Sequence, residues 1–509
     1  MGRWQRAFGI LSIGLVLAGC GPLSTPGEPL TPLSTPTTTA APTEAAIPST
    51  SAGAAQSPAP TMTLVPTAVP GVQGNGHSYN PGISADGRWV VFQSEARNLV
   101  KGDTNGMSDI FVHDRQTGTT ERVSVASDGT QGDGESFSPT ISADGRWVAF
   151  WSFASSLVAG DTEKCGEGDN TYNCADVFVH DLQMGTTERI VAGGSGGLGG
   201  GSHSLGISAD GRWVAFYSWA SNLVTGDTNG RWDVFVHDRQ TGITELVSVA
   251  GDGTQGNGNS VEPAISADGR WVAFVSWASN LVAGDSNAQP DVFVYDRQTG
   301  ETRLVSAASD GAQGDGESGI MLHQEGWSAG LSISADGRWV AFTSSASNLA
   351  AGDTNECDDP IRGPHNCYDV FVHDLQTGVT ARVSVASDGT QSDDESDAPS
   401  ISADGRWVVF WSSASNLVAG DTNECPYSTG SPNCPDVFVR DLQTGTTERV
   451  SVASDGTQAN EASVASGVSA DGRWVVFWSV ASNLVADDSN GFMDVFVHDR
   501  RTGRTERVP

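Results

Sequence analysis

The stretch Ile83–Phe92 reads I-S-A-D-G-R-W-V-V-F, and its D-G-R-W core recurs along the rest of the chain. Seven copies of the core begin at Asp86, Asp144, Asp210, Asp268, Asp336, Asp404 and Asp471. A second sequence, D-[VI]-F-V-x-D, follows each copy and begins at Asp109, Asp176, Asp233, Asp291, Asp369, Asp436 and Asp494. A unit repeated in this way indicates a modular array in which neighbouring units bury each other's faces. Repetition therefore accounts for the length of 509 residues without several unrelated domains.

Each repeat predicts four short antiparallel strands. The second strand (W-V-A-F-x-S, Trp147–Ser152) and the third (D-V-F-V-H-D, Asp176–Asp181) are nearly all apolar and should be buried on both faces. The first strand includes Pro139–Ser142, and the fourth, Thr119–Val125, alternates and carries charges, which suits an exposed outer edge. Glycine turns separate the strands. Seven such units predict an all-β fold, a seven-bladed β-propeller with four antiparallel strands per blade.

The two repeated sequences also resemble a known repeat. P-x-I-S-x-D-G-R-x-[VI]-A-F followed by D-[VI]-[FY]-V-x-D is similar to the TolB-like β-propeller repeat, and the similarity covers about Val72 to Pro509. That family includes the propeller of the periplasmic TolB protein, propellers attached to peptidases and many bacterial surface proteins of unknown role. The resemblance therefore implies the propeller fold and leaves several functions open.

The first 72 residues differ in composition from the repeats. Arg3 and Arg6 precede a mostly apolar run that ends in L-A-G-C at Cys20, which resembles a bacterial lipoprotein signal. By that resemblance residues 1–20 are a signal peptide and Cys20 becomes the lipidated first residue. The alternative, a plain transmembrane helix, needs about 20 apolar residues. Residues 21–72 are rich in Pro, Thr and Ser and predict a disordered linker before the propeller at residues 73–509. We therefore expect a lipid-anchored chain in the cell envelope, outside the cytoplasm.

The other six cysteines form three close pairs. They are Cys165 and Cys174, Cys357 and Cys367, and Cys425 and Cys434. An exported chain permits disulfides, and three local bridges leave no odd thiol. Zinc is the alternative, but the pairs are not C-x-x-C and have no histidine at zinc-finger spacing. The sequence therefore predicts three disulfides.

The spacing of the two repeated sequences shows where the blades differ. The separation of their first aspartates is 23 residues in blades 1, 3, 4 and 7, but 32 or 33 in blades 2, 5 and 6, which carry the cysteine pairs. A further insertion, Ser318–Ser328, lies between blades 4 and 5. Strand alternation puts all four insertions on one face, and variation in loop length often accompanies function. We expect a partner to bind this face at blades 4–6, with His323, Glu325 and Trp327 as partner-binding residues.

The chain is strongly acidic, with 61 acidic against 27 basic residues and a net charge of −34. Such a charge excludes nucleic acid as a partner and favours cations or basic partners. Oxygen-bearing side chains at alternate positions follow the second strand, and such oxygens suit calcium. The candidate calcium ligands are Asp103, Asn105, Asp109, Asp227, Asn229 and Asp233. The alternative is that these Asp and Asn residues cap turns of their own backbone.

The sequence does not predict a catalytic site. G-G-S-G-G at Gly193–Gly197 matches a nucleophile-elbow string but lacks the required strand before it and helix after it. Five histidines share one position of the repeat, which indicates a structural role. We therefore expect a monomeric, non-enzymatic binding or scaffold module for a protein or glycan partner. The alternative is a propeller enzyme, a glycan hydrolase or lyase with an acidic central funnel, whose candidate acids are Glu135, Glu262 and Glu395.

Overall fold

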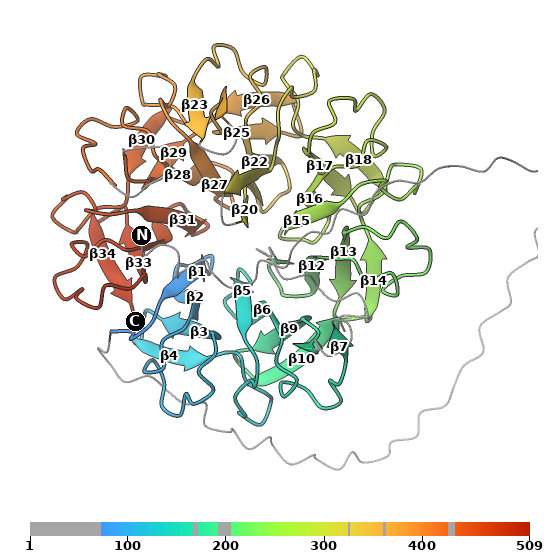
Figure 1. Cartoon of the computed structure of the whole chain (residues 1–509), viewed down its shortest axis with the longest axis vertical. Helices are drawn as coiled ribbons and strands as arrows, with labels where there is room; N and C mark the ends of the chain where they lie inside the picture. Colours follow the sequence, from blue (N-terminus) through green and yellow to red (C-terminus); the bar gives the residue numbers. More distant parts are fainter. Residues whose placement is uncertain (1–72, 166–171, 192–204, 324–325, 360–362, 426–432) are drawn as a thin grey trace, which may run out of the picture. The chain divides into compact units, whose positions relative to one another are not determined.

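Seven four-stranded antiparallel sheets form the blades of a ring (Figure 1). The computed structural model describes residues 73–165, 172–191, 205–323, 326–359, 363–425 and 433–509. In each blade the first strand lies nearest the centre of the ring and the fourth lies at the rim. The predicted seven-bladed, all-β propeller is confirmed. The signal peptide, Cys20, the linker and Gly193–Gly197 lie outside the described residues.

Strands recur at matching places of the repeat. The first strands are β1 (Ser78–Ile83), β5 (Ser136–Ile141), β11 (Gly206–Ile207), β15 (Ser260–Ile265), β21 (Leu331–Ile333), β27 (Ser396–Ile401) and β31 (Ser463–Val468). The second strands are β2 (Trp89–Ser94), β6 (Trp147–Ser152), β12 (Trp213–Ser218), β16 (Trp271–Ser276), β22 (Trp339–Ser344), β28 (Trp407–Ser412) and β32 (Trp474–Ser479). The third strands are β3 (Asp109–Asp114), β9 (Asp176–Asp181), β13 (Asp233–Asp238), β17 (Asp291–Asp296), β25 (Asp369–Asp374), β29 (Asp436–Asp441) and β33 (Asp494–Asp499). The fourth strands are β4 (Thr119–Arg122), β10 (Thr186–Val191), β14 (Ile243–Leu246), β18 (Glu301–Leu304), β26 (Val379–Arg382), β30 (Thr446–Arg449) and β34 (Arg504–Val508).

The second and third strands begin and end where the sequence predicts. The fourth strand of blade 1 is shorter than predicted, because it ends at Arg122 rather than Val125. Beyond that point the chain turns toward the next blade, and Val125 instead pairs with Gln131 in an isolated bridge.

The core lies between neighbouring blades. In blade 1, Phe92 of β2 stacks on Phe111 of β3 with ring centroids 5.8 Å apart, and a corresponding Phe pair is present in every blade. Seven clusters of buried apolar side chains each combine residues from adjacent blades. Burying one Val, Leu or Phe side chain contributes about 1.5–3 kcal/mol. Each blade therefore depends on both neighbours for its stability.

The D-G-R-W sequence forms the turn between the first and second strands. Asp86 Oδ1 accepts hydrogen bonds from Ser84 Oγ (2.6 Å) and from the backbone N–H of Arg88 (3.0 Å). Gly87 has φ = 72°, a left-handed conformation that glycine adopts without strain. Arg88 donates two hydrogen bonds, of 2.9 and 2.7 Å, to Asp114 at the end of β3. These hydrogen bonds with Arg88 lower the pKa of Asp114 to about 2.

The tryptophan of the same sequence joins one blade to the next. A Cβ added to Gly145 of blade 2 would lie 2.3 Å from Cδ1 of Trp89 in blade 1. Gly87 of blade 1 and Trp474 of blade 7 form the same contact, where an added Cβ would lie 2.1 Å from the ring. The repeated sequence therefore encodes a contact between blades as well as a turn.

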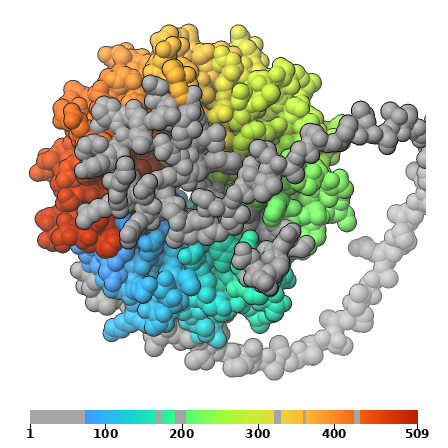
Figure 2. All heavy atoms as spheres, in the orientation of Figure 1, coloured from blue at the N-terminus to red at the C-terminus, as the bar shows by residue number. Residues whose placement is uncertain are grey.

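The ring closes between blades 7 and 1 without exchanging a strand, since β31 to β34 come from one continuous segment. Ser78 N–H donates to the carbonyl of Met493 (2.8 Å), and Ala470 N–H donates to the carbonyl of Ala85 (3.0 Å). Gln73, which precedes blade 1, donates to Asp488 (2.9 Å) and Asp494 (3.1 Å) of blade 7. Figure 2 shows the blade 1 atoms, in blue, directly against the blade 7 atoms, in red.

The insertions form small hairpins. They are β7 (Lys164–Cys165) with β8 (Tyr172–Asn173), β19 (Ile320–His323) with β20 (Gly326–Ala329), and β23 (Glu356–Asp359) with β24 (Gly363–Asn366). The three predicted disulfides are confirmed, each joining the two cysteines of one insertion. Such bridges are consistent with a location outside the cytoplasm. Within the described residues, no helix is long and apolar enough to cross a membrane.

Candidate functional site: the insert-bearing face

We call the face that carries the loops between second and third strands the insert-bearing face. In blade 1 its loop brings Asp103 and Asp109 together, as predicted for a calcium site. However, Gln131 Nε2 donates to Asp103 Oδ1 (2.9 Å) and to Asp109 Oδ2 (3.0 Å). The guanidinium of Arg122 lies 3.5 Å from Asp103 and 3.4 Å from Asp109, and Asn105 donates to a backbone carbonyl (2.9 Å). Blade 1 thus supplies its own donors and counter-charge to the predicted calcium ligands.

This loop carboxylate pair recurs in every blade. The pairs are Asp103 with Asp109, Asp161 with Asp176, Asp227 with Asp233, Asp285 with Asp291, Asp353 with Asp369, Asp421 with Asp436, and Asp488 with Asp494. In six blades one glutamine donates to both carboxylates, and these glutamines are Gln131, Gln255, Gln313, Gln391, Gln458 and Gln73. In blade 2 the corresponding segment falls outside the described residues.

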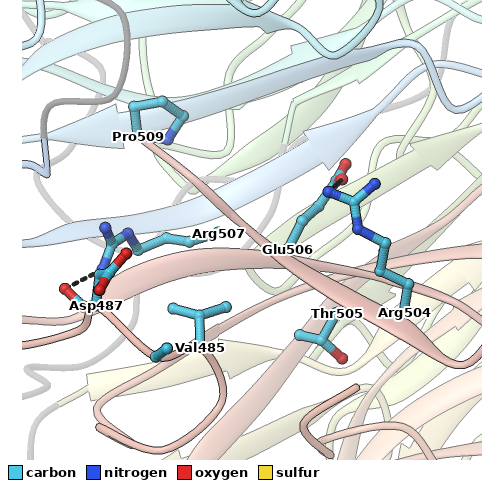
Figure 3. Close-up of a pocket in the computed structure, with 8 residues that line it drawn as sticks. Val485, Asp487, Arg504, Thr505, Glu506, Arg507 and Pro509 are labelled. Carbon is cyan, nitrogen blue, oxygen red and sulfur yellow. Dashed lines mark hydrogen bonds and ion pairs between the residues drawn. The ribbon is translucent and has the colours of Figure 1, made fainter. Parts of the chain in front are cut away.

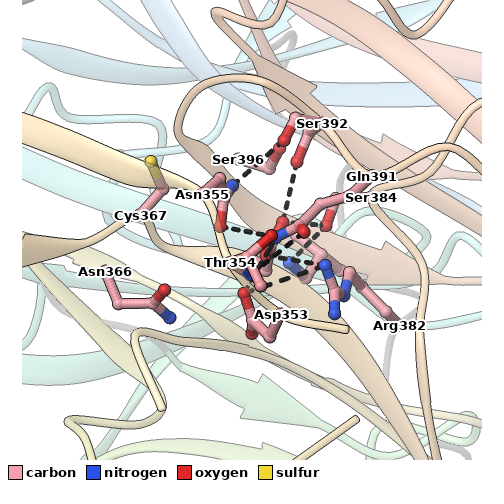
Figure 4. A network of polar contacts seen from close by, with 12 residues as sticks. Asp353, Thr354, Asn355, Asn366, Cys367, Arg382, Ser384, Gln391, Ser392 and Ser396 are labelled. Atoms are coloured by element: carbon pink, nitrogen blue, oxygen red, sulfur yellow. Dashed lines mark hydrogen bonds and ion pairs between the residues drawn. The ribbon is translucent and has the colours of Figure 1, made fainter. Parts of the chain in front are cut away.

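Figure 4 shows Asp353 with Gln391 and Arg382 in blade 5, where a disulfide-closed hairpin interrupts the loop. Gln391 Nε2 lies 2.8 Å from Asp353 Oδ1 and 3.0 Å from Asp369 Oδ2. The Arg382 guanidinium lies 3.8 and 3.6 Å from the same two carboxylates. The insertion therefore leaves the proximity of Asp353 and Asp369 intact.

In the six blades other than blade 2, burial raises the pKa of the second carboxylate of the pair above that of an ordinary aspartate. It reaches about 6 for Asp233, Asp291, Asp369, Asp436 and Asp494. Serine hydroxyls oppose the shift, as where Ser248 Oγ donates to Asp233 Oδ1 (2.7 Å). At neutral pH these carboxylates are anionic and benefit from a counter-charge.

Five blades provide that counter-charge with an arginine from the fourth strand. These are Arg122, Arg189, Arg382, Arg449 and Arg507, each within 4.0 Å of a carboxylate of its pair. Arg189 also pairs with Glu163 (3.0 Å), which lies close to Asp161 and Asp176 in blade 2, and so balances part of their combined negative charge. Leucines, Leu246 and Leu304, occupy the position in blades 3 and 4.

Sequence reasoning identified the carboxylates and missed the glutamine and the arginine. Both stand at a fixed distance along the chain from the second aspartate of the pair, except that blade 7 takes its glutamine, Gln73, from the segment before blade 1. The glutamine follows by 22 residues, as from Asp109 to Gln131, and the arginine by 13, as from Asp109 to Arg122. That constant spacing is the signal that would have revealed them.

The repeated histidines have the structural role that the sequence predicts. His113 Nδ1 lies 2.9 Å from Thr120 Oγ1, and burial lowers the pKa of His113. In blade 2, His180 contacts Thr187, whose hydroxyl donates to the carbonyl of Val125 in blade 1. Since that hydroxyl donates its proton to the carbonyl, the histidine must donate from Nδ1. The His–Thr pair therefore joins adjacent blades.

Three aromatic rings, of which Trp219 is exposed, lie together in blade 3 on the insert-bearing face. Trp219 is 48% exposed and stacks on Trp232 with centroids 5.5 Å apart and planes within 5°. Tyr217 meets Trp232 edge to face at 5.4 Å. We call Tyr217, Trp219 and Trp232 the aromatic shelf. Its two indoles belong to the first and last residues of the single loop between β12 and β13.

A second group, the acid cluster, consists of Glu317, His365, Tyr368 and Glu395 in blades 5 and 6. Tyr368 Oη donates to Glu317 (2.5 Å), and Tyr368 N–H donates to Glu395 Oε2 (2.8 Å). His365 Nε2 lies 3.1 Å from Glu395 Oε1, while its Nδ1 lies 2.9 Å from a backbone carbonyl. Both ring nitrogens thus face acceptor oxygens, which satisfies a protonated imidazolium.

The three acids proposed for a catalytic funnel contact different neighbours. Glu135 lies beside Glu95, and burial raises the pKa of Glu135. Glu262 is buried inside β15, with φ = 54°. Burial, and after it the charge of Glu262, raises the pKa of Tyr217. Glu395 belongs to the acid cluster. Glu262 therefore lies within the first strand of its blade, whereas Glu135 and Glu395 directly precede theirs.

The proposed partner-binding residues belong to the hairpin of β19 and β20. His323 pairs with Gly326, and Leu322 with Trp327, across this hairpin. Glu325 lies outside the described residues. The hairpin therefore positions the backbone of His323 and Trp327, and their partner-binding role stays a prediction.

A pocket of about 280 Å³ lies at the rim of blade 7 (Figure 3). Its lining includes Val485, Asp487, Arg504 and Arg507. Arg507 reaches toward the carbonyl of Asp487 (3.4 Å). The pocket contains none of the site residues predicted from the sequence.

The chain has matches among solved structures. No family model matches the sequence, and no curated protein matches it. Among solved structures, TolB from Acinetobacter baumannii is 16% identical with a TM-score of 0.37, and the match covers 73% of this chain and 62% of TolB. An oligogalacturonate lyase from Vibrio parahaemolyticus is 13% identical over 86% of this chain and 92% of the lyase, with a TM-score of 0.46. A puromycin-hydrolyzing peptidase of Mycobacterium tuberculosis is 13% identical over 87% of this chain and 56% of the peptidase, with a TM-score of 0.48.

The names of these neighbours cover TolB, a lyase and a peptidase, so the likeness concerns the fold alone. The chain spans less than two thirds of the length of the TolB structure. The chain is a seven-bladed β-propeller whose structural neighbours include TolB proteins.

Proposed function

We propose that this chain is a lipid-anchored, extracytoplasmic, non-enzymatic binding module that holds a glycan or protein partner on its insert-bearing face. The observation that carries the proposal is the aromatic shelf, in which the half-exposed Trp219 stacks on Trp232. Tryptophan and tyrosine offer large, rigid contact areas and are enriched in binding hot spots. The lipid anchor at Cys20 and the monomeric state belong to the same proposal and rest on the sequence.

The shelf favours a glycan over a protein. The face of an indole accepts the C–H face of a sugar ring, and the indole N–H groups of Trp219 and Trp232 are hydrogen-bond donors. An acidic propeller surface disfavours polyanionic glycans, which points to neutral or basic sugars.

Binding of the full-length chain to immobilised neutral and amino-sugar polysaccharides tests the proposal. The variant Trp219→Ala should weaken binding at least about tenfold, the loss of about 1.4 kcal/mol. Ile243→Ala is the matched control, because Ile243 is 65% exposed but follows the Gln-Thr-Gly turn on the opposite face of the same blade. Equal binding by wild type and Trp219→Ala, or equal loss in both variants, would refute the shelf as the site.

One observation favours a second candidate, a glycan hydrolase or lyase. The acid cluster links two carboxylates, Glu317 and Glu395, to His365 and Tyr368, and such groups perform general acid–base catalysis. Release of reducing or unsaturated ends from polysaccharides, abolished by Glu395→Gln, would establish this activity. Turnover that survives Glu395→Gln would exclude the acid cluster as its origin.

A further inference from the structure

Seven copies of one loop in a single chain provide an internal comparison. The carboxylate pair and its glutamine are kept from blade to blade, while the fourth-strand residue changes between arginine and leucine. Blades with arginine balance two carboxylates with one positive charge. Blade 3, with Leu246, has Asp227 and Asp233 and no cationic side chain in contact with either, within the residues the structure describes.

Both carboxylates of blade 3 are nonetheless removed from water. Asp227 is 6% exposed and Asp233 is 0% exposed. Their hydrogen-bond donors are neutral: Gln255 Nε2 contacts Asp227 Oδ1 (2.8 Å) and Asp233 Oδ2 (2.9 Å), and Asn229 Nδ2 contacts Asp233 Oδ2 (2.8 Å). Two buried anions with neutral donors alone are costly, because each loses its hydration without an opposite charge.

One oxygen of the pair also lacks a partner. Oδ2 of Asp227 is buried and makes no hydrogen bond. Buried carboxylate oxygens are almost always hydrogen-bonded or bound to a cation. In blade 4 the first carboxylate, Asp285, is half-buried and keeps contact with solvent. Blade 3 is therefore the loop in which the missing arginine matters most.

Blade 1 shows where the positive charge belongs. The Arg122 nitrogen that lies between Asp103 Oδ1 and Asp109 Oδ2 faces the same two oxygens that Gln131 contacts. The corresponding oxygens of Asp227 and Asp233 keep their glutamine in blade 3. Leu246 is shorter than arginine, so the side of the pair opposite the glutamine is free of a guanidinium.

We propose that the loop of blade 3 binds one calcium ion through Asp227 and Asp233, at the place that a guanidinium takes in blade 1. Calcium is a hard cation that accepts carboxylate oxygens in irregular geometry and completes its six to eight ligands with water. The ion balances the two negative charges, and the unpaired oxygen of Asp227 becomes one of its ligands. The inference concerns the loop alone, so it can fail while partner binding by the aromatic shelf stands.

Calorimetric titration of the full-length chain with calcium chloride alone, together with thermal unfolding, tests the site. Wild type should bind calcium at this site and unfold at a higher temperature as calcium rises. Leu246→Arg supplies the guanidinium that five blades contain, and should raise the Kd of that site at least tenfold. Asp227→Asn should also raise the Kd of that site at least tenfold, because it removes a ligand. It tests the proposal if Leu246→Arg does not fold.

Asp103→Asn in blade 1 is the matched control, because Arg122 already lies against that pair and calcium binding should not change. Absence of calcium binding by wild type overturns the proposal and would leave a proton shared between Asp227 and Asp233 as the neutralising charge. Binding that is unaffected by both Leu246→Arg and Asp227→Asn overturns it as well, as does an equal loss in Asp103→Asn.

Discussion

Replacing Gln73 by alanine tests how the ring closes. Gln73 is the only member of the glutamine series that comes from a segment before blade 1, within the described residues, and its contacts with Asp488 and Asp494 join the two ends of the propeller. A hydrogen bond to a charged group contributes about 1.5–3 kcal/mol, so the two bonds set an upper limit of about 6 kcal/mol. Because Gln73 is partly exposed, we expect a loss of about 2–4 kcal/mol in the free energy of unfolding.

Denaturant unfolding of Gln73→Ala, followed by tryptophan fluorescence, measures that loss. Gln131→Ala is the matched control, since Gln131 makes the equivalent contacts with Asp103 and Asp109 inside the continuous chain. Both variants should lose similar stability if the N-terminal segment gives blade 7 the contacts that Gln131 gives blade 1. If Gln73→Ala kept the stability of the wild type while Gln131→Ala lost stability, this account of closure would be refuted. The apolar contact between blades 7 and 1 would then be the cause of closure.

Two further substitutions test other contacts between blades. Gly145→Ala should destabilise the fold by about 2–4 kcal/mol, because it adds left-handed backbone strain and a clash with Trp89. Gly118→Ala should cost only about 1–2 kcal/mol, because Gly118 has a similar φ of 72° but open space around it. Equal losses of the two variants in denaturant unfolding would exclude the clash. Burial lowers the pKa of His180 to about 4. Between pH 6.5 and 4 this histidine is therefore protonated in the unfolded state but not in the folded state. The free energy of unfolding should fall by about 2–3 kcal/mol by pH 4.5. His180→Tyr, which copies Tyr295 of blade 4, should remove this part of the pH dependence when unfolding is compared at pH 7 and 4.5, and an unchanged dependence would contradict it.

The fold could be predicted because each repeated residue is required locally. Asp86, Gly87 and Arg88 specify a turn by their own hydrogen bonds and backbone conformation, and the apolar runs specify buried strands by their period. Ring closure could not be predicted, because it depends on Gln73, whose partners lie 415 and 421 residues away. Its resemblance to the glutamine of the repeat was visible, but the sequence does not say which blade it reaches.

The candidate site could be predicted only in part, for a related physical reason. Carboxylates close in sequence share a loop, so their proximity followed from spacing. What neutralises them depends on strands that approach from elsewhere, and Arg122 and Gln131 converted the predicted calcium ligands of blade 1 into an internal ion-pair network. The aromatic shelf was missed because it combines two repeat positions. Blade 4 also has a tryptophan, Trp277, at the position of Trp219, but it has Pro290 at the position of Trp232, so only the structure shows that two rings stack in blade 3.

The two proposals meet in one loop, which makes their coupling measurable. Trp232 directly precedes Asp233, the carboxylate that closes the proposed calcium site, and Trp232 in turn supports Trp219. An ion that fixes the loop would hold Trp232 in place before a partner arrives, and allosteric couplings of this kind change affinity by about 5–150-fold. We therefore expect calcium to tighten partner binding by wild type and to have no effect on Leu246→Arg, whose loop already carries its charge. Partner binding that is equally strong with calcium and with chelator would separate the two sites, because a ligand that orders Trp232 must favour whatever rests on it.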